Sequence, residues 1–101
     1  MMVQFSIMPI SDSPHLSEAI ARAVKIIDES DLDYRLTPMG TLIRGEWKEV
    51  MAVIKKCHEA VKEDYDRVVS QIKIDDKKNG EVSFEDKVKS IEDKVKVKLK
   101  K

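Results

Sequence analysis

The chain has few residues of the kinds that build covalent or metal cross-links. Cys57 is the single cysteine, and His15 and His58 are the two histidines. One cysteine forms no disulfide within its own chain. The sequence also has no CxxC pair and no Cys/His cluster with the spacing of zinc ligands. We therefore expect neither a disulfide framework nor a metal site.

Long apolar runs and an excess of charge of one sign are also missing. No apolar run approaches the roughly 18 residues that span a bilayer. The N-terminal residues 1–11 lack the basic start and the long apolar centre of a signal peptide. The 19 basic and 19 acidic residues cancel, so no global field attracts nucleic acid or an anionic membrane. We expect a soluble, cytoplasmic protein that binds neither of them.

What the chain does contain suits one globular domain. Apolar residues make up 42% of the 101 residues, enough for a folded core and too many for wholesale disorder. A chain of this length builds one modest core. We expect a single domain over residues 1–101.

Apolar alternation predicts four strands. They cover residues 2–10, 34–38, 41–44 and 66–75. The two middle strands join at Met39 and Gly40, where glycine allows the positive φ of a tight turn. Leu36 and Ile43 are expected to face the core.

Helical spacing of apolar residues predicts three helices. The first runs to residue 29, with Ser13 as N-cap and Pro14 as first residue. The second covers residues 47–63, with an apolar stripe that includes Cys57. The third covers residues 83–99 and is capped by Ser83. Its apolar residues alternate in spacings of four and three, as in a coiled coil: Phe84, Val88, Ile91, Val95 and Leu99.

This order of elements, β-α-β-β-α-β with an added C-terminal helix, predicts a ferredoxin-like α+β sandwich. A four-stranded antiparallel sheet would carry two helices on one face. The other face would expose Met8, Leu42 and Val69, and the strand at 66–75 would form an open edge. Such surfaces favour association with a second copy, so we expect a homodimer or homotetramer with sheet-face and edge-strand contacts.

Two stretches resemble a known family. The stretch 36–47, LTPMGTLIRGEW, is followed by KKCHEA at 55–60, and the opening strand and helix match as well. In these features the chain resembles the small thiamine-binding protein family. The resemblance implies a ferredoxin-like fold, dimers or tetramers, and non-catalytic binding of thiamine or its hydroxymethylpyrimidine part. One departure is Arg44, where the family commonly has Glu, which puts a contact to a cationic ligand or a neighbouring subunit in doubt.

The candidate ligand site lies around the predicted turn between the two middle strands. An aminopyrimidine needs a few hydrogen-bonding groups at its edge and apolar contacts on its faces. The hydroxyls would come from Ser6, Ser11, Thr37 and Thr41, the close approach from Gly40 and an apolar contact from Met39. The alternative is that these residues serve only the turn, where Thr, Pro and Gly are common.

No enzyme motif is present, so we expect a protein that is not an enzyme and needs no cofactor. Cys57 and His58 are adjacent on a helix and point about 100° apart, which disfavours a nucleophile pair. Cys57 is expected in the core, His58 is expected to be partly exposed in a surface or interface role, and His15 is expected to be exposed. Two alternatives stay open. One is a small-molecule enzyme using either histidine, and the other is a regulatory subunit whose only task is assembly.

Overall fold

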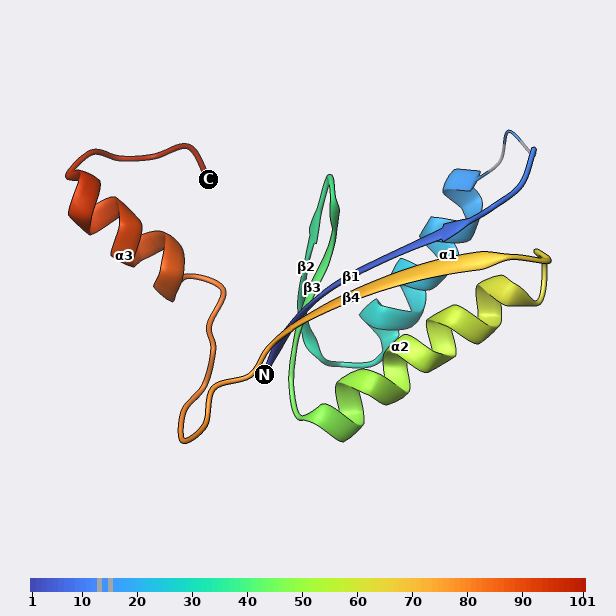
Figure 1. Ribbon diagram of the computed structural model, residues 1–101, viewed down its shortest axis with the longest axis horizontal. Coiled ribbons are helices and arrows are strands. Elements are labelled where there is room, and N and C mark those ends of the chain that lie inside the picture. Colours follow the sequence, from blue (N-terminus) through green and yellow to red (C-terminus); the bar gives the residue numbers. More distant parts are fainter. Residues whose placement is uncertain (13, 15) are drawn as a thin grey trace.

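The predicted order of strands and helices is found in the computed structural model, which describes residues 1–12, 14 and 16–101. The fold is the predicted ferredoxin-like α+β sandwich (Figure 1). Ser13, the predicted N-cap, and His15 lie outside the described residues. The elements are β1 (Met2–Pro9), α1 (Leu16–Glu29), β2 (Asp33–Thr37), β3 (Gly40–Arg44), α2 (Trp47–Lys62), β4 (Val68–Asp75) and α3 (Asp86–Val95).

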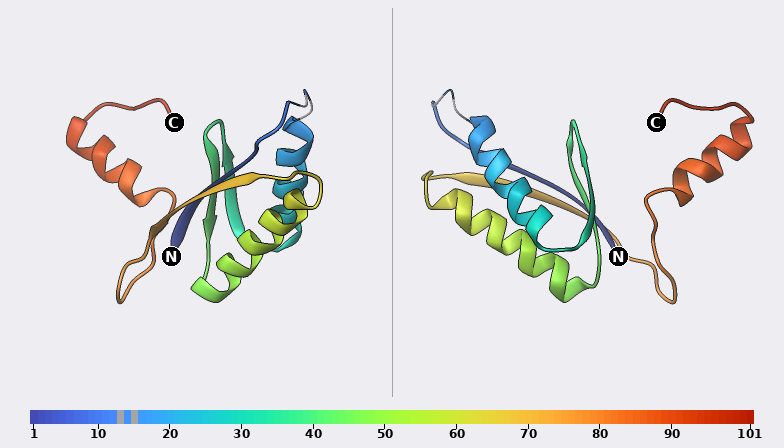
Figure 2. Two further views of the ribbon diagram at one scale, coloured as in Figure 1. Left: turned by 45° about the vertical axis from the view of Figure 1, so that its right-hand side comes forward. Right: turned by 180° about the vertical axis from the view of Figure 1, so that it is seen from behind.

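The four strands form one antiparallel sheet in the order β2-β3-β1-β4. Helices α1 and α2 cover one face of this sheet, and α3 stands apart from both of them (Figure 2). The register pairs Gln4 with Leu42 and Met8 with Val69, so these residues share the face that α1 and α2 leave open. The predicted composition of the open face and the predicted edge position of β4 are therefore confirmed.

The core lies between the sheet and the two helices. Strand β1 contributes the alternate residues Val3, Phe5 and Ile7, and α2 contributes the predicted stripe with Cys57 fully buried. Burial of each large aliphatic side chain contributes roughly 1.5–3 kcal/mol. Ile43 faces the core as predicted. Leu36 pairs with Thr41 and therefore lies on the same side of the sheet as Ile43. It is nevertheless 62% exposed, because β2 is an edge strand.

Strand β1 is longer than the ladder it forms with β3. The pairing between them ends at Phe5 and Thr41, because the β2-β3 hairpin turns at Gly40. The remainder of β1, residues 6–9, pairs only with β4. Figure 1 shows the hairpin turning away from β1 beyond this point. One side of the last four residues of β1 is thus free of strand pairing, next to the hairpin turn and α1.

Helix α3 is shorter than the predicted 83–99. The chain leaves the helix at Lys96, which adopts a left-handed conformation with φ 62°. Beyond it, the backbone N–H of Leu99 donates to a carboxylate oxygen of Glu92, so the chain folds back along the helix. At the other end, α3 begins at Asp86 with Glu85 as its N-cap residue, and not at Ser83 as predicted. The Ser83 hydroxyl still accepts the backbone N–H of Asp86 at 3.0 Å.

The C-terminal segment 81–101 is attached to the open face mainly through Phe84. The ring lies 4.8 Å from the guanidinium carbon of Arg35 and 5.6 Å from that of Arg44. Arg35 also pairs with Glu85, and Arg44 pairs with Glu81. No residue of α3 itself is buried, and Val88, Ile91 and Val95 of the predicted apolar seam are exposed.

Candidate functional site

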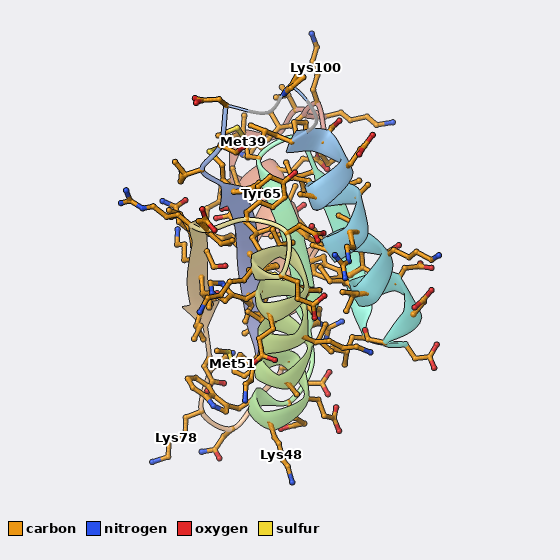
Figure 3. The ribbon with its side chains drawn as sticks, turned by 90° about the vertical axis from the view of Figure 1, so that its right-hand side faces the viewer. Met39, Lys48, Met51, Tyr65, Lys78 and Lys100 are labelled. Atoms are coloured by element: carbon orange, nitrogen blue, oxygen red, sulfur yellow. The ribbon has the colours of Figure 1, made fainter. Side chains whose placement is uncertain are left out.

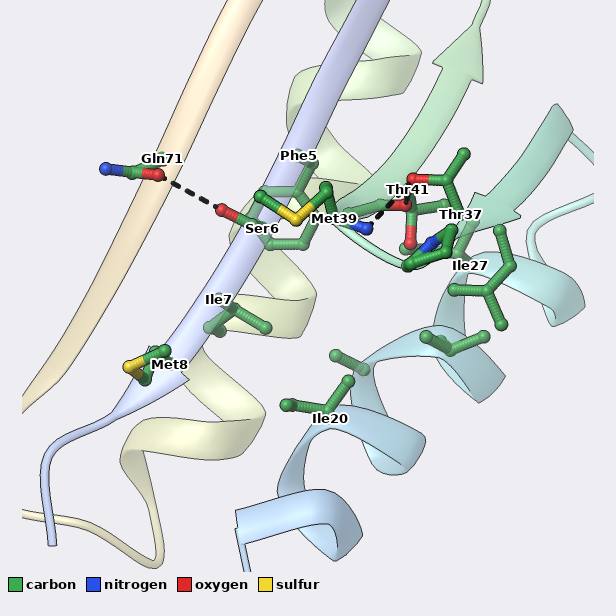
Figure 4. A pocket seen from close by; sticks show the side chains of 15 residues that line it. Phe5, Ser6, Ile7, Met8, Ile20, Ile27, Thr37, Met39, Thr41 and Gln71 are labelled. Carbon is green, nitrogen blue, oxygen red and sulfur yellow. Dashed lines mark hydrogen bonds between the residues drawn. The ribbon is translucent and has the colours of Figure 1, made fainter.

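A cavity of about 350 Å³ lies where β1, the hairpin turn and α1 meet. We call it the hairpin cavity (Figure 4). Its lining comes from β1 (Phe5, Ser6, Ile7, Met8), from α1 (Ile20, Ala23, Val24, Ile27), from the hairpin (Leu36, Thr37, Pro38, Met39, Gly40, Thr41) and from β4 (Gln71). Apolar side chains form most of the wall, and a few polar groups interrupt it. That combination is typical of small-ligand sites.

Five of the six predicted site residues line this cavity, and the sixth does not. Ser6, Thr37, Met39, Gly40 and Thr41 meet there. Ser11 follows the end of β1 and lies outside the lining. The sequence interpretation missed the contribution of α1, and it missed Gln71. Strand register pairs Gln71 with Ser6, so a correct alignment of β4 against β1 would have found it.

The hairpin turn is shaped by Thr37 and Gly40. The Thr37 hydroxyl donates to the carbonyl of Gly40 at 2.7 Å and accepts the backbone N–H of Met39 at 3.2 Å. Gly40 has φ 148°, and a Cβ there would lie 2.9 Å from the carbonyl oxygen of Phe5. The predicted need for glycine is confirmed. The missing side chain makes room for the backbone of β1, and the Thr37 hydroxyl serves the turn.

Thr41 differs from Thr37 in what its hydroxyl contacts. Its side chain lines the cavity and the residue is 4% exposed. Every fully enclosed side-chain N or O atom among the described residues has a hydrogen-bond partner. None of the hydrogen bonds between described side chains involves the Thr41 hydroxyl. Thr41 is therefore the nearly buried polar side chain that a ligand in the cavity can engage.

The cavity mouth has a polar side and an apolar rim. The Ser6 hydroxyl lies 3.4 Å from the side-chain oxygen of Gln71 (Figure 4). Met39, at the hairpin tip, is 80% exposed, and Met8 is also exposed. Figure 3 places Met39 at the end of the molecule opposite Lys48 and Lys78. The mouth therefore lies far from the start of α2 and the charged loop after β4.

Cys57 and His58 contribute nothing to the cavity lining. Burial raises the pKa of the Cys57 thiol to about 11, and its Sγ donates to the carbonyl of Ala23 at 3.3 Å. The predicted core position of Cys57 is confirmed. His58 is half-buried, and its Nδ1 lies 2.6 Å from the Ser70 hydroxyl. The two side chains thus have separate surroundings, and the expected partly exposed position of His58 is confirmed.

Arg44 lies at the far end of β3 from the hairpin turn. Its guanidinium pairs with Asp33 at 3.1 Å and with Glu81 at 3.4 Å, and it is not part of the cavity lining. The departure from the family pattern at this position therefore leaves the cavity unchanged. In this chain Arg44 helps to hold the C-terminal segment instead.

The described residues contain no group of three or more His, Cys, Asp or Glu placed to share a metal ion. In the same part of the chain, no helix has the length and apolar character needed to cross a bilayer.

Sequence comparison places the chain among known proteins. Residues 3–92 match a family described as thiamine-binding protein. The chain belongs to this family. The UPF0045 protein YqgV of Bacillus subtilis is 37% identical over an alignment of 92 residues. The alignment covers 85% of this chain and 88% of that protein. The UPF0045 protein MJ1052 of Methanocaldococcus jannaschii is 34% identical over 88 residues, which are 87% and 88% of the two chains.

Solved structures of family relatives share the fold. The structure of MJ1052 matches with a TM-score of 0.81 at 33% identity, covering 89% of this chain and 93% of that chain. A Thermotoga maritima protein, TM0486, whose name gives a suggested role in thiamine biosynthesis or salvage, matches with a TM-score of 0.78 at 29% identity. That match covers 89% of this chain and 96% of that chain. The resemblance noted in the sequence is thus confirmed.

Proposed function

We propose that the protein binds thiamine or its hydroxymethylpyrimidine part in the hairpin cavity, without chemical conversion. The observation that carries the proposal is the nearly buried polar residue Thr41 in the wall of a mostly apolar cavity of about 350 Å³. This volume is near the lower end for ligand sites, which suits a single heteroaromatic ring. Membership of the thiamine-binding family supports the same ligand class.

The cavity wall matches the chemistry of an aminopyrimidine. Ile20, Ile27 and Met39 offer apolar contact to the ring faces, while Thr41 and Gln71 offer hydrogen bonds to its edge. None of the described residues that line the cavity is Asp, Glu, His, Cys or Lys. General acid–base catalysis needs a titratable group near the substrate. The lining therefore supports capture, for storage, delivery or sensing, over the alternative of a small-molecule enzyme.

Calorimetry and thermal unfolding with thiamine and with hydroxymethylpyrimidine test the proposal. A ligand at 100 times its Kd stabilises the native state by about 2.7 kcal/mol. For a chain of this size that raises Tm by about 10 °C or more. A saturable rise with either compound is expected. A folded sample that gives neither heat nor a Tm shift with both compounds would contradict the proposal.

We also propose that the protein acts as a homodimer or homotetramer. The apolar side chains of α3, Val88, Ile91 and Val95, are exposed, and so are Met8 and Val69 on the open face of the sheet. Unpartnered apolar surface of this kind favours association. The same surfaces favour the alternative function, a regulatory subunit whose task is assembly, if no ligand binds.

Light scattering after size exclusion tests the assembly. Ile91→Asp puts a charge on the exposed apolar side of α3 and is expected to lower the molar mass. Ser90→Asp adds the same charge at the polar residue that precedes Ile91 in α3. This variant is expected to leave the molar mass unchanged. A monomeric wild-type protein would contradict the proposal. An unchanged mass for Ile91→Asp would exclude α3 from the interface.

A further inference from the structure

A second hollow, on the open face of the sheet, adjoins the hairpin cavity. This hollow, which we call the open-face groove, has a volume of about 460 Å³ and is lined by Gln4, Ser6, Met39, Gln71, Ile72 and Lys73. Ser6, Met39 and Gln71 line both spaces. A ligand with its ring in the cavity can therefore extend past Ser6 and Gln71 onto the open face.

The charge that lines the hairpin cavity and the open-face groove is positive only. Of the described residues that line either of them, Lys73 alone is charged, although charged residues make up 38% of the chain. None of the ion pairs between described residues uses Lys73. Asp75, the next residue of β4 on this face, is not part of the lining. The site therefore offers an ammonium group and no carboxylate.

The positive charge of the lining favours some substituents on the pyrimidine ring of the ligand over others. In thiamine the pyrimidine is joined to a thiazolium cation, which would meet no opposite charge here and would lie on the side of Lys73. A phosphoryl group in the same position would meet the ammonium group and the polar side chains of Gln4 and Gln71. Opposite charges at a partly exposed site attract, and salt screens that attraction.

We infer that the cavity and the groove form one elongated site, which prefers a heteroaromatic ring carrying a phosphoryl group to the same ring joined to a cation. The inference rests on the proposed function, because it takes the ring position from it. Lys73 is the residue that makes the distinction, and the hairpin cavity holds the ring in either case.

Calorimetric titrations at low and at 0.5 M salt test the inference with three probes. These are hydroxymethylpyrimidine, hydroxymethylpyrimidine phosphate and thiamine. At low salt the phosphate is expected to bind about two- to fivefold more tightly than the unphosphorylated pyrimidine, the range for one exposed ion pair. Thiamine is expected to bind more weakly than the pyrimidine. The advantage of the phosphate should shrink at 0.5 M salt.

Two variants assign the effect to Lys73. Lys73→Gln is expected to remove the advantage of the phosphate over the unphosphorylated pyrimidine, so that the two probes bind it with similar affinity. Lys77→Gln, in the loop after β4, removes the same charge outside the groove and should keep the advantage. A phosphate advantage that survives in Lys73→Gln, or thiamine binding more tightly than the pyrimidine, would overturn the inference alone. No binding of any pyrimidine probe would overturn the proposed function and the inference together.

Discussion

Replacing Thr41 by valine separates a binding role from a structural one. Valine keeps the shape and β-branching of threonine and removes only the hydroxyl. Thr41 lines the cavity, and its hydroxyl takes part in none of the hydrogen bonds between described side chains. The free energy of unfolding should therefore change by less than about 0.5 kcal/mol. Loss of one hydrogen bond to a neutral ligand costs about 0.5–1.5 kcal/mol, so Kd should rise about 2- to 12-fold.

Thr37→Val is the matched control on the same hairpin. Its hydroxyl makes two hydrogen bonds within the turn, to the carbonyl of Gly40 and from the N–H of Met39. The variant should lose about 1–2 kcal/mol of unfolding free energy. Urea denaturation measures stability, and calorimetry with hydroxymethylpyrimidine measures affinity. An unchanged Kd in Thr41→Val, with the native fold retained, would refute the assignment of Thr41 as a ligand contact.

Three more predictions concern the fold around the site. Gly40→Ala forces a side chain into a conformation with φ 148° and against the Phe5 carbonyl, so urea denaturation should show a loss of about 2–3 kcal/mol; a loss below about 1 kcal/mol would contradict this. Phe84→Ala removes the anchor of the C-terminal segment, so amide exchange in α3 should quicken about tenfold while the core keeps its protection; unchanged exchange in α3 would show that the segment is held elsewhere. The pKa of Cys57 is raised to about 11, so the thiol of the unfolded chain ionises first. The contribution of Cys57 to stability should therefore be constant below about pH 8 and fall by about 2–3 kcal/mol by pH 11; an equal fall in Cys57→Ala would refute this origin.

The fold was largely predictable because its elements repeat simple spacings. The alternation of Val3, Phe5 and Ile7 predicted β1 as a strand with one buried face, and the stripe containing Cys57 predicted α2. Both patterns report burial directly, since one face of each element meets the core. The end of α3 was not predictable from apolar spacing. The left-handed turn at Lys96 and the return of the chain to Glu92 interrupt a pattern that continues in the sequence.

The candidate site was predictable only in part, because a cavity depends on tertiary geometry. The resemblance drew attention to the hairpin, and Thr41 and Ser6 do line one cavity. The sequence did not show that β1 extends beyond the last residue that pairs with β3. This extension leaves room for the hairpin cavity. Nor did the sequence show that α1 closes the wall, or that Arg44 lies at the far end of β3 and binds the C-terminal segment.

The central claim is that the ligand occupies the hairpin cavity, and amide chemical-shift mapping during a titration with hydroxymethylpyrimidine tests it directly. The account predicts saturable shifts at Ser6, Ile7, Gly40 and Thr41, with little change in α3. Shifts that cluster away from β1 and the hairpin, or the absence of any saturable shift, would contradict it.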